Sequence, residues 1–292
     1  MKLRIILIGV LLNLVACSAQ LTQKGFIAQD DILTSYTVEK WQEWQRVYSA
    51  FELKPISIIV NDNTSANSGK SSAETIVIKG IFLDHPSSKE VIYFLQGNGM
   101  SVENSMASVM ESLGKLNKDI VIFDRRGTGA SNGEAMIANL ITDATQQFDY
   151  IEQKLLPEKI IIHGFSLGSF IAGQVVKVKT PSALVLQGSA TNVDEWIDAR
   201  MPWYSKLFIS IDVEPVFQQV DNKRVLAESY KNPLLIIAGE DDQQAPVELS
   251  RRLFDVSQSA SKQLMVVENA SHSNMLEKTE EISLYRKFLA SL

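Results

Sequence analysis

The sequence of 292 residues contains only one cysteine and three histidines. One cysteine excludes a disulfide within the chain, and no H-E-x-x-H motif or clustered His/Cys set is present to hold a catalytic metal. Basic charge is also scarce: the net charge is -6, and basic pairs such as Arg125–Arg126 and Arg251–Arg252 are short. Nucleic-acid binding usually requires a basic face. We therefore expect no metal, no cofactor and no nucleic-acid partner.

The composition that is present is that of a globular protein. Hydrophobic residues make up 45% of the chain and charged residues 21%, which are ordinary values for a folded domain. The length suits one α/β domain with a complete core, or at most two small domains.

The first twenty residues have the layout of an export signal. Residues 1–4 are positively charged and residues 5–15 are apolar, but this run is too short to span a bilayer as a mature helix. Residues 14–17, Leu-Val-Ala-Cys, resemble the lipobox of bacterial lipoproteins, in which the cysteine is acylated and becomes the mature N-terminus. The alternatives are an ordinary secretory signal with an incidental cysteine, and a buried N-terminal strand.

Acylation of Cys17 predicts a protein that is exported and anchored to a bacterial membrane. The resemblance implies three acyl chains, and two are enough for stable binding. Ser18 stands where an aspartate would favour retention in an inner membrane, so we expect the outer membrane, on its periplasmic side or surface, if the host has one. Residues 1–16 are then the signal peptide and residues 17–54 an N-terminal segment, with a tether over about 18–36 and a helix over 38–51.

From residue 55 to the C-terminus, apolar runs alternate with helical patterns. The runs predict strands at 56–60, 75–83, 91–95, 119–123, 159–162, 183–186, 234–238 and 263–267, and the polar residues 61–72 predict a hairpin loop. Continuous apolarity favours strands covered on both faces. One apolar face at 140–155 predicts a long helix. The alternation predicts an α/β fold with a doubly wound, mostly parallel sheet, whose functional residues lie at the carboxyl ends of strands.

The strand at 159–162 is followed by His-Gly-Phe-Ser-Leu-Gly at 163–168 and then by a helical pattern. A G-x-S-x-G sequence between a strand and a helix is typical of a nucleophile elbow, whose tight turn requires glycine at both flanking positions. The turn lifts the Ser166 hydroxyl above the sheet and directs the Leu167 N–H to the same point from the positive end of a helix. We predict Ser166 as a nucleophile and the Leu167 amide as an oxyanion donor.

A serine nucleophile needs a general base, and the three histidines differ in position. His163 lies in the strand before the elbow and is expected to pack around it, while His85 lies in a turn on the amino-terminal side of the sheet. His272 follows the last predicted strand, with acids and the serine upstream, and is the predicted base. The acid that orients it is expected among Glu240, Asp241 and Asp242, after the strand at 234–238.

Residues 75–292 resemble the α/β hydrolases, nearest to the minimal-lid serine hydrolases of the BEM46 and monoacylglycerol-lipase-like type. Five motifs agree in order: Gln-Gly-Asn-Gly at 96–99, Asp-Arg-Arg-Gly-Thr-Gly-Ala-Ser at 124–131, the elbow, Gly-Glu-Asp-Asp at 239–242, and the His272 loop. The family's G-x-x-D spacing implies that Asp242 is the acid. Its H-G-N motif implies that the Asn98 N–H is the second oxyanion donor. The loop at 124–131 is structural in relatives and shapes the mouth of the site. Two positions depart from the pattern, Gln96 in place of histidine and Ser271 in place of glycine.

An insertion over about 189–231 covers the site in relatives as a lid. The predicted domain is thus an α/β-hydrolase fold over residues 55–292 with a small lid insertion. Phe165, Trp203 and Tyr204 are candidates for an apolar wall around an acyl group. The alternative is that they pack as ordinary core.

These features predict a serine hydrolase that cleaves carboxylic ester or thioester bonds of a small molecule or lipid through an acyl-enzyme. The alternatives are a serine peptidase of the same fold and an inactive lipoprotein that uses the fold for binding. A dinucleotide-binding enzyme is disfavoured because the glycines at 127–133 have G-x-G-x-x-x-G spacing outside a first βαβ unit.

Overall fold

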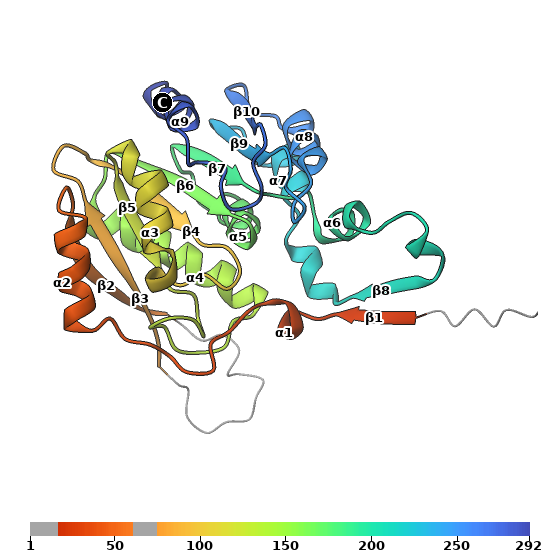
Figure 1. The fold of residues 1–292 in the computed structure, drawn as a ribbon, viewed down its shortest axis with the longest axis horizontal. Helices are drawn as coiled ribbons and strands as arrows, with labels where there is room; N and C mark the ends of the chain where they lie inside the picture. The colour runs from red at the N-terminus through yellow and green to blue at the C-terminus, as the bar shows by residue number, and fades with distance from the viewer. Residues whose placement is uncertain (1–16, 61–74) are drawn as a thin grey trace, which may run out of the picture.

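The structure is a computed structural model that describes residues 17–60 and 75–292. A central sheet of eight strands runs through the molecule (Figure 1). From one edge to the other its strands are β10 (Lys262–Val267), β9 (Leu234–Gly239), β7 (Ala183–Gln187), β6 (Lys159–Phe165), β4 (Glu90–Leu95), β5 (Asp119–Phe123), β3 (Ile76–Asp84) and β2 (Glu52–Val60). The β2–β3 and β3–β5 pairs are antiparallel and the other neighbours are parallel. The predicted mostly parallel sheet is confirmed.

Helices cover both faces of this sheet. One face packs against α4 (Ile137–Tyr150), α5 (Leu167–Val175), α7 (Asn222–Glu228) and α8 (Val247–Val256). The other packs against α2 (Val38–Val47), α3 (Val102–Ser112) and α9 (Thr279–Ala290). Every residue of β5 and β7 is buried, which is why all of them except the terminal Asp119 and Gln187 are apolar.

The predicted elements correspond closely to those observed. All eight apolar runs form strands, and the helix expected over 140–155 is α4 followed by the π-helical turn η3 (Ile151–Leu155). The helix expected over 38–51 ends at Val47, and the Gln45 side chain then caps the next turn by donating to the Phe51 carbonyl at 2.8 Å. The predicted hairpin loop at 61–72 lies outside the described residues.

The insertion at 189–231 contains α6 (Val193–Arg200), the short turns η4 (Ser205–Leu207) and η5 (Pro215–Gln219), β8 (Ile209–Val213) and α7. β8 pairs in parallel with β1 (Cys17–Leu21), with Cys17 opposite Ile209. This two-stranded arm stands to one side of the main sheet (Figure 1). The other short helical turn in the described part of the chain, η2 (Leu113–Leu116), continues α3.

Residues 18–36 differ from the predicted tether because they lie along the domain. β1 leads into α1 (Gln23–Phe26), and Ile27 is buried in the core. The amides of Asp30 and Thr34 donate to the carbonyls of Gly127 and Gly129, each at 2.7 Å. Most of these contacts use backbone atoms and isolated side chains, so they leave no periodic pattern that the sequence could show.

No helix within 17–60 and 75–292 is long and apolar enough to cross a membrane. In the same part of the chain no three His, Cys, Asp or Glu side chains gather as a metal site would require. The predicted signal peptide, residues 1–16, lies outside the described residues.

Candidate active site

The elbow between β6 and α5 holds Ser166 in an unusual backbone conformation. Its φ of 52° and ψ of -120° lie in a region that residues with a side chain rarely adopt. The Ser166 N–H donates to the Gln187 carbonyl on β7 at 2.9 Å, which fixes the turn to the sheet. A Cβ at position 168 would lie 2.0 Å from the Leu95 carbonyl oxygen, and one at position 164 would lie 2.5 Å from the Ser169 Cα. The turn therefore requires its two glycines, as the sequence predicted.

His272 lies in the loop after the carboxyl end of strand β10, and its ring is hydrogen-bonded to the Asp242 carboxylate. His272 Nδ1 is 2.7 Å from Asp242 Oδ2, and both side chains are buried. The other carboxylate oxygen, Oδ1, accepts the N–H groups of Gln244 and Ala245, each at 2.8 Å. The aspartate therefore has a fixed orientation, and it places the proton of the imidazole on Nδ1 with Nε2 free to act as a base.

The other two acids of the group do not reach the imidazole. Asp241 and Glu240 are exposed, and Glu240 instead accepts the Asn269 N–H at 3.3 Å. The G-x-x-D spacing and the geometry thus select the same carboxylate, Asp242.

The remaining two histidines lie elsewhere. His163 on β6 is fully buried, with Nε2 2.9 Å from Gln187 Oε1 and Nδ1 3.2 Å from the Tyr285 hydroxyl. Burial lowers the pKa of His163 to about 4. His85 lies in the turn between β3 and β4, where its Nδ1 is 3.0 Å from the Ser87 hydroxyl. Neither presents a free nitrogen to Ser166.

Ser166 and His272 line the same cleft. His272 Nε2 is buried and has no hydrogen-bond partner among the described residues, and the two side chains are not hydrogen-bonded to each other. Catalytic hydrogen bonds of this kind often tighten only when substrate is bound. The arrangement leaves an unpaired basic nitrogen on a side chain that lines the same cleft as the serine.

Two backbone amides are available beside the serine. The Leu167 N–H begins α5, and the Asn98 N–H lies in the loop after β4. Neither donates a hydrogen bond to another residue in the described ranges. Gln96, which replaces the usual histidine, supports this loop: it is buried, and its Nε2 donates to the Phe123 carbonyl at 3.1 Å.

The walls of the cleft differ from the prediction. Trp203 and Tyr204 are 78% and 58% exposed and do not line the cleft. They lie in the loop between α6 and β8, outside the pocket. Its aromatic walls come instead from three side chains of other elements, Phe26 of α1, Phe170 of α5 and Trp196 of α6. The space within the cleft is about 170 Å³, which is enough for a small acyl group.

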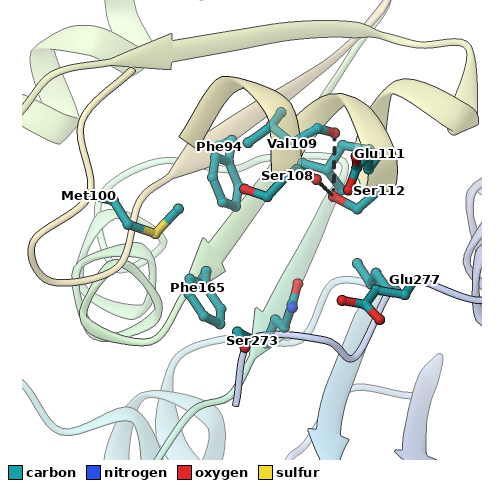
Figure 2. Close-up of a pocket in the computed structure, with 12 residues that line it drawn as sticks. Phe94, Met100, Ser108, Val109, Glu111, Ser112, Phe165, Ser273 and Glu277 are labelled. Atoms are coloured by element: carbon teal, nitrogen blue, oxygen red, sulfur yellow. Dashed lines mark hydrogen bonds between the residues drawn. The ribbon is translucent and has the colours of Figure 1, made fainter. Parts of the chain in front are cut away.

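Phe165 lines a second cleft. Its ring centroid lies 5.0 Å from that of His272. Figure 2 shows Phe165, Met100 and Ser273 around this space, with Ser108, Val109 and Glu111 on α3 above it. Phe165 therefore lies against His272 and lines this second cleft, and it is not among the residues that line the Ser166 cleft.

Arg200 contributes a positively charged side chain to the lining of the Ser166 cleft. Its guanidinium lies over the Trp196 ring, 4.8 Å from the centroid, and it forms no salt bridge with the described residues. The indole is itself fixed, since Trp196 Nε1 donates to the Gln244 carbonyl at 2.7 Å. Neither Phe26 nor Arg200 carried a sequence signal of its role, because both come from segments remote from the motifs.

Known proteins share this architecture. The profile of the α/β-hydrolase fold family matches residues 90–210. An esterase of Pyrococcus furiosus, Pf2001, superposes with a TM-score of 0.67 at 21% identity, over 91% of this chain and 99% of the esterase. The chain has the α/β-hydrolase fold. In this chain the Gly-Phe-Ser-Leu-Gly turn begins at the Gly164–Phe165 end of β6, and His272 follows β10.

Sequence relatives extend the similarity. An uncharacterized protein of Mycobacterium tuberculosis is 27% identical over 215 residues, which cover 72% of this chain and 74% of the relative. The lysophosphatidylserine lipase ABHD12 of Danio rerio is 28% identical over 185 residues, 59% of this chain and 48% of the lipase. The matched part of the chain therefore spans about half the length of that lipase.

Proposed function

We propose that the protein is a serine hydrolase that cleaves carboxylic ester or thioester bonds, with Ser166 as nucleophile, His272 as base and Asp242 as the acid that orients it. The observation that carries the proposal is the free Nε2 of His272 in the same cleft as Ser166, while its Nδ1 is held by Asp242 at 2.7 Å. The motifs at 96–99 and 239–242 further suggest the BEM46 and monoacylglycerol-lipase-like type within the fold.

In the proposed reaction the Ser166 hydroxyl attacks the carbonyl carbon while His272 Nε2 takes its proton. The Leu167 and Asn98 amides donate to the oxygen that becomes negative in the tetrahedral intermediate. His272 then gives the proton to the leaving alcohol or thiol. Water, deprotonated by the same nitrogen, releases the acyl group and restores the serine.

The cleft suggests the kind of ester. Its aromatic walls suit an apolar acyl group, and Arg200 at the same cleft suits an ester that carries an anionic group elsewhere. The relative ABHD12 is named as a lipase of lysophosphatidylserine, an ester of that class. We include lysophospholipids among the substrates to be tested.

We further propose that Cys17 is acylated and holds the protein on a bacterial membrane, on the outer membrane if the host has one. Phe26 of the cleft lies nine positions after Cys17, a span of at most about 30 Å when extended. An anchored protein would therefore keep the cleft near the membrane surface, where lipid esters are available.

A fluorophosphonate probe tests the hydrolase proposal, since it labels a serine only where an active base and oxyanion hole are present. We expect labelling of the wild type and none of Ser166→Ala. Hydrolysis of 4-nitrophenyl esters and thioesters of increasing chain length then defines the acyl group. Cleavage of peptides in preference to esters would favour the peptidase alternative, and an unlabelled, inactive wild type would favour a binding lipoprotein.

Metabolic labelling with an alkyne fatty acid tests the anchor. The wild type should take up the label and fractionate with membranes, while Cys17→Ser should do neither. A wild type that takes up no label and is released in soluble form would contradict the anchor and leave the hydrolase proposal intact.

A further inference from the structure

The loop between β4 and α3 carries Asn98, whose N–H is the second proposed oxyanion donor. This loop has no ladder hydrogen bonds to set the direction of its peptide groups. In a trans peptide the C=O and the following N–H point in opposite directions. Whatever holds the Gly97 carbonyl therefore also sets the direction of the Asn98 N–H.

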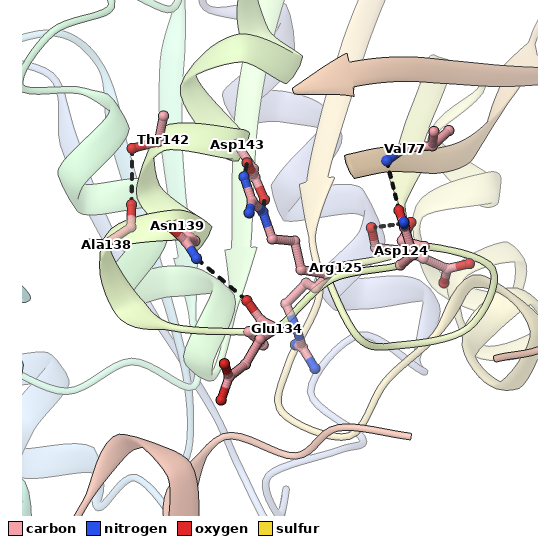
Figure 3. Close-up of polar contacts among 12 residues, drawn as sticks. Val77, Asp124, Arg125, Glu134, Ala138, Asn139, Thr142 and Asp143 are labelled. Carbon is pink, nitrogen blue, oxygen red and sulfur yellow. Dashed lines mark hydrogen bonds and ion pairs between the residues drawn. The ribbon is translucent and has the colours of Figure 1, made fainter. Parts of the chain in front are cut away.

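Arg125 holds that carbonyl together with the Met100 N–H, which donates to it at 3.3 Å. Arg125 Nη1 donates to the carbonyl oxygen of Gly97 and to that of Gln96, the latter at 3.2 Å. Figure 3 shows Arg125 next to Asp124 on the loop that follows β5. Its Nε and Nη2 are buried and lack hydrogen-bond partners among the described residues. Burial lowers the pKa of Arg125 to about 10, so the guanidinium is still charged at neutral pH. A cation on the carbonyl side polarises the peptide and strengthens its N–H as a donor.

The Asn98 side chain is held from another direction. Its Oδ1 accepts the Ala28 N–H at 2.8 Å, and its Nδ2 donates to the Phe26 carbonyl at 2.7 Å. The carboxamide thus satisfies both backbone groups of the N-terminal segment that face it. The backbone of Asn98, and not its side chain, remains available to substrate.

The N-terminal segment rests on the same loop that carries Arg125. Besides the contacts of Asp30 and Thr34 described above, Asp30 Oδ2 accepts the Gly129 N–H at 2.6 Å. The Tyr36 hydroxyl donates to Asp124 Oδ2 at 2.6 Å. The other oxygen of Asp124 accepts the Val102 N–H at 2.6 Å, at the far end of the oxyanion loop. One loop, residues 124–129, therefore fixes the oxyanion loop both directly and through the N-terminal segment.

We propose that Arg125 and the Asn98 side chain are positioning residues of the oxyanion hole, which orient the Gly97–Asn98 peptide so that its N–H faces Ser166. The backbone of residues 26–28 is the support for Asn98. The inference rests on the proposed serine hydrolase function. It makes the N-terminal segment a part of the active site, because removal of residues 22–36 would free the Asn98 side chain.

Two variants separate positioning from general stability. Arg125→Met removes the charge and the donors, while Asn98→Ala removes only the side chain and keeps the proposed catalytic N–H. Asn132→Ala is the matched control. Its carboxamide also bridges two backbone groups, the Val77 N–H at 2.7 Å and the Thr75 carbonyl at 3.0 Å, away from the oxyanion loop.

Three quantities are measured for each variant: kcat and KM on 4-nitrophenyl butyrate, the inhibition constant of a trifluoromethyl ketone, and the melting temperature. The ketone reports on the oxyanion hole because it forms a tetrahedral oxyanion on the serine. Loss of a whole oxyanion donor costs about 100- to 1,000-fold in kcat, so a misdirected one should cost about 10- to 100-fold in Arg125→Met and about 5- to 20-fold in Asn98→Ala. KM should change by less than about threefold, since ground-state binding does not use the oxyanion hole. The ketone should lose affinity in parallel with kcat.

We expect Asn132→Ala to lower the melting temperature and leave kcat and the ketone's affinity unchanged. Folded Arg125→Met and Asn98→Ala proteins with the kcat and ketone affinity of the wild type would overturn the inference, as would an equal loss of kcat in Asn132→Ala. If Arg125→Met does not fold, Asn98→Ala alone decides. A wild type that the fluorophosphonate leaves unlabelled contradicts the proposed function itself, whereas a labelled wild type with unaffected variants contradicts only this inference.

Discussion

His163 and His272 both lie at the carboxyl side of the sheet near Ser166, yet their surroundings differ in every property that matters for a base. His163 is closed in by Phe94, Gln187 and Tyr285, and both of its ring nitrogens have partners. His272 has one nitrogen held by a buried carboxylate and the other without a hydrogen-bond partner among the described residues. His163 lies only three residues before Ser166 in the sequence, but this proximity does not enable it to act as a base. What matters is one fixed nitrogen and one free nitrogen.

The largest expected effect tests this comparison directly. Ser166→Ala and His272→Ala should each lower kcat on an activated ester by about ten-thousand-fold or more, because nucleophile and base act as one unit. The double variant should lose little more than either single one. His163→Gln should retain most of the turnover. Kinetics of these four proteins, with circular dichroism to verify folding, would reverse the assignment if His163→Gln were the inactive one.

The acid that orients His272 comes next. Asp242→Asn should lower kcat by about 100- to 10,000-fold, because an amide at this place cannot stabilise the imidazolium and favours the wrong tautomer. Asp241→Asn is the matched control, because Asp241 is the adjacent carboxylate and is exposed. Its kcat should stay within about twofold of that of the wild type. An inactive Asp241→Asn beside an active Asp242→Asn would contradict the geometry.

These two predictions concern residues whose positions in the site could be predicted from the sequence. The elbow dictates its own backbone, since the glycines flanking Ser166 are needed for a turn that leaves no space for a Cβ. His272 and Asp242 follow strands whose apolarity is continuous, and parallel strands bring such ends to one edge of the sheet. Local patterns therefore suffice to place these three side chains together.

The walls of the cleft could not be predicted in the same way. Phe26 reaches the cleft from a segment that has no periodic pattern and is held by hydrogen bonds to the 124–129 loop. Trp203 and Tyr204 looked like wall residues because they are aromatic, but their exposure of 78% and 58% places them outside. The sequence shows that a side chain is aromatic and apolar. Whether that side chain lines the cleft depends on packing between segments that are distant in the sequence.

Phe26→Ala tests whether Phe26, which lines the cleft, contributes more to substrate binding than the exposed Trp203. Truncation removes apolar wall area worth about 1–2 kcal/mol, so kcat/KM for a butyrate or longer ester should fall about 5- to 30-fold. Acetate esters should lose less, because they contact less of the wall. Trp203→Ala, the control suggested by the sequence alone, should change neither value. A loss confined to Trp203→Ala would restore the sequence-based assignment of the wall.

Arg200→Gln should have a smaller and substrate-dependent effect. An exposed ion pair is worth less than about 1 kcal/mol, so kcat/KM for 4-carboxyphenyl butyrate should fall about three- to fivefold, while that for neutral phenyl butyrate should not change. Arg224→Gln removes an exposed arginine that pairs with Glu228 outside the cleft and serves as the control. Equal losses on both esters would show that Arg200 acts through packing on Trp196 and not through its charge.

The smallest effect on turnover, and the sharpest test of the contrast between the histidines, concerns His163 and pH. Burial lowers the pKa of His163 to about 4, whereas in an unfolded chain it is about 6.5. Between these values the unfolded chain binds a proton that the folded protein does not, so stability falls as pH falls from about 6.5 to 4. Asp119 acts in the opposite sense: burial raises its pKa to about 6, so its contribution to stability is lost as pH rises through the same window.

Urea unfolding from pH 4 to 7 separates these two groups. The difference in unfolding free energy between the wild type and His163→Gln should change by about 3 kcal/mol across the window, in favour of the variant at low pH. Asp119→Asn should alter the slope in the other direction, because it removes the group that favours the folded state in acid. Absolute stability can be lower in either variant without affecting the test, since only the dependence on pH is compared. A His163→Gln protein whose pH dependence matches that of the wild type would show that this imidazole is not held neutral, and the contrast with His272 would then rest on hydrogen bonding alone.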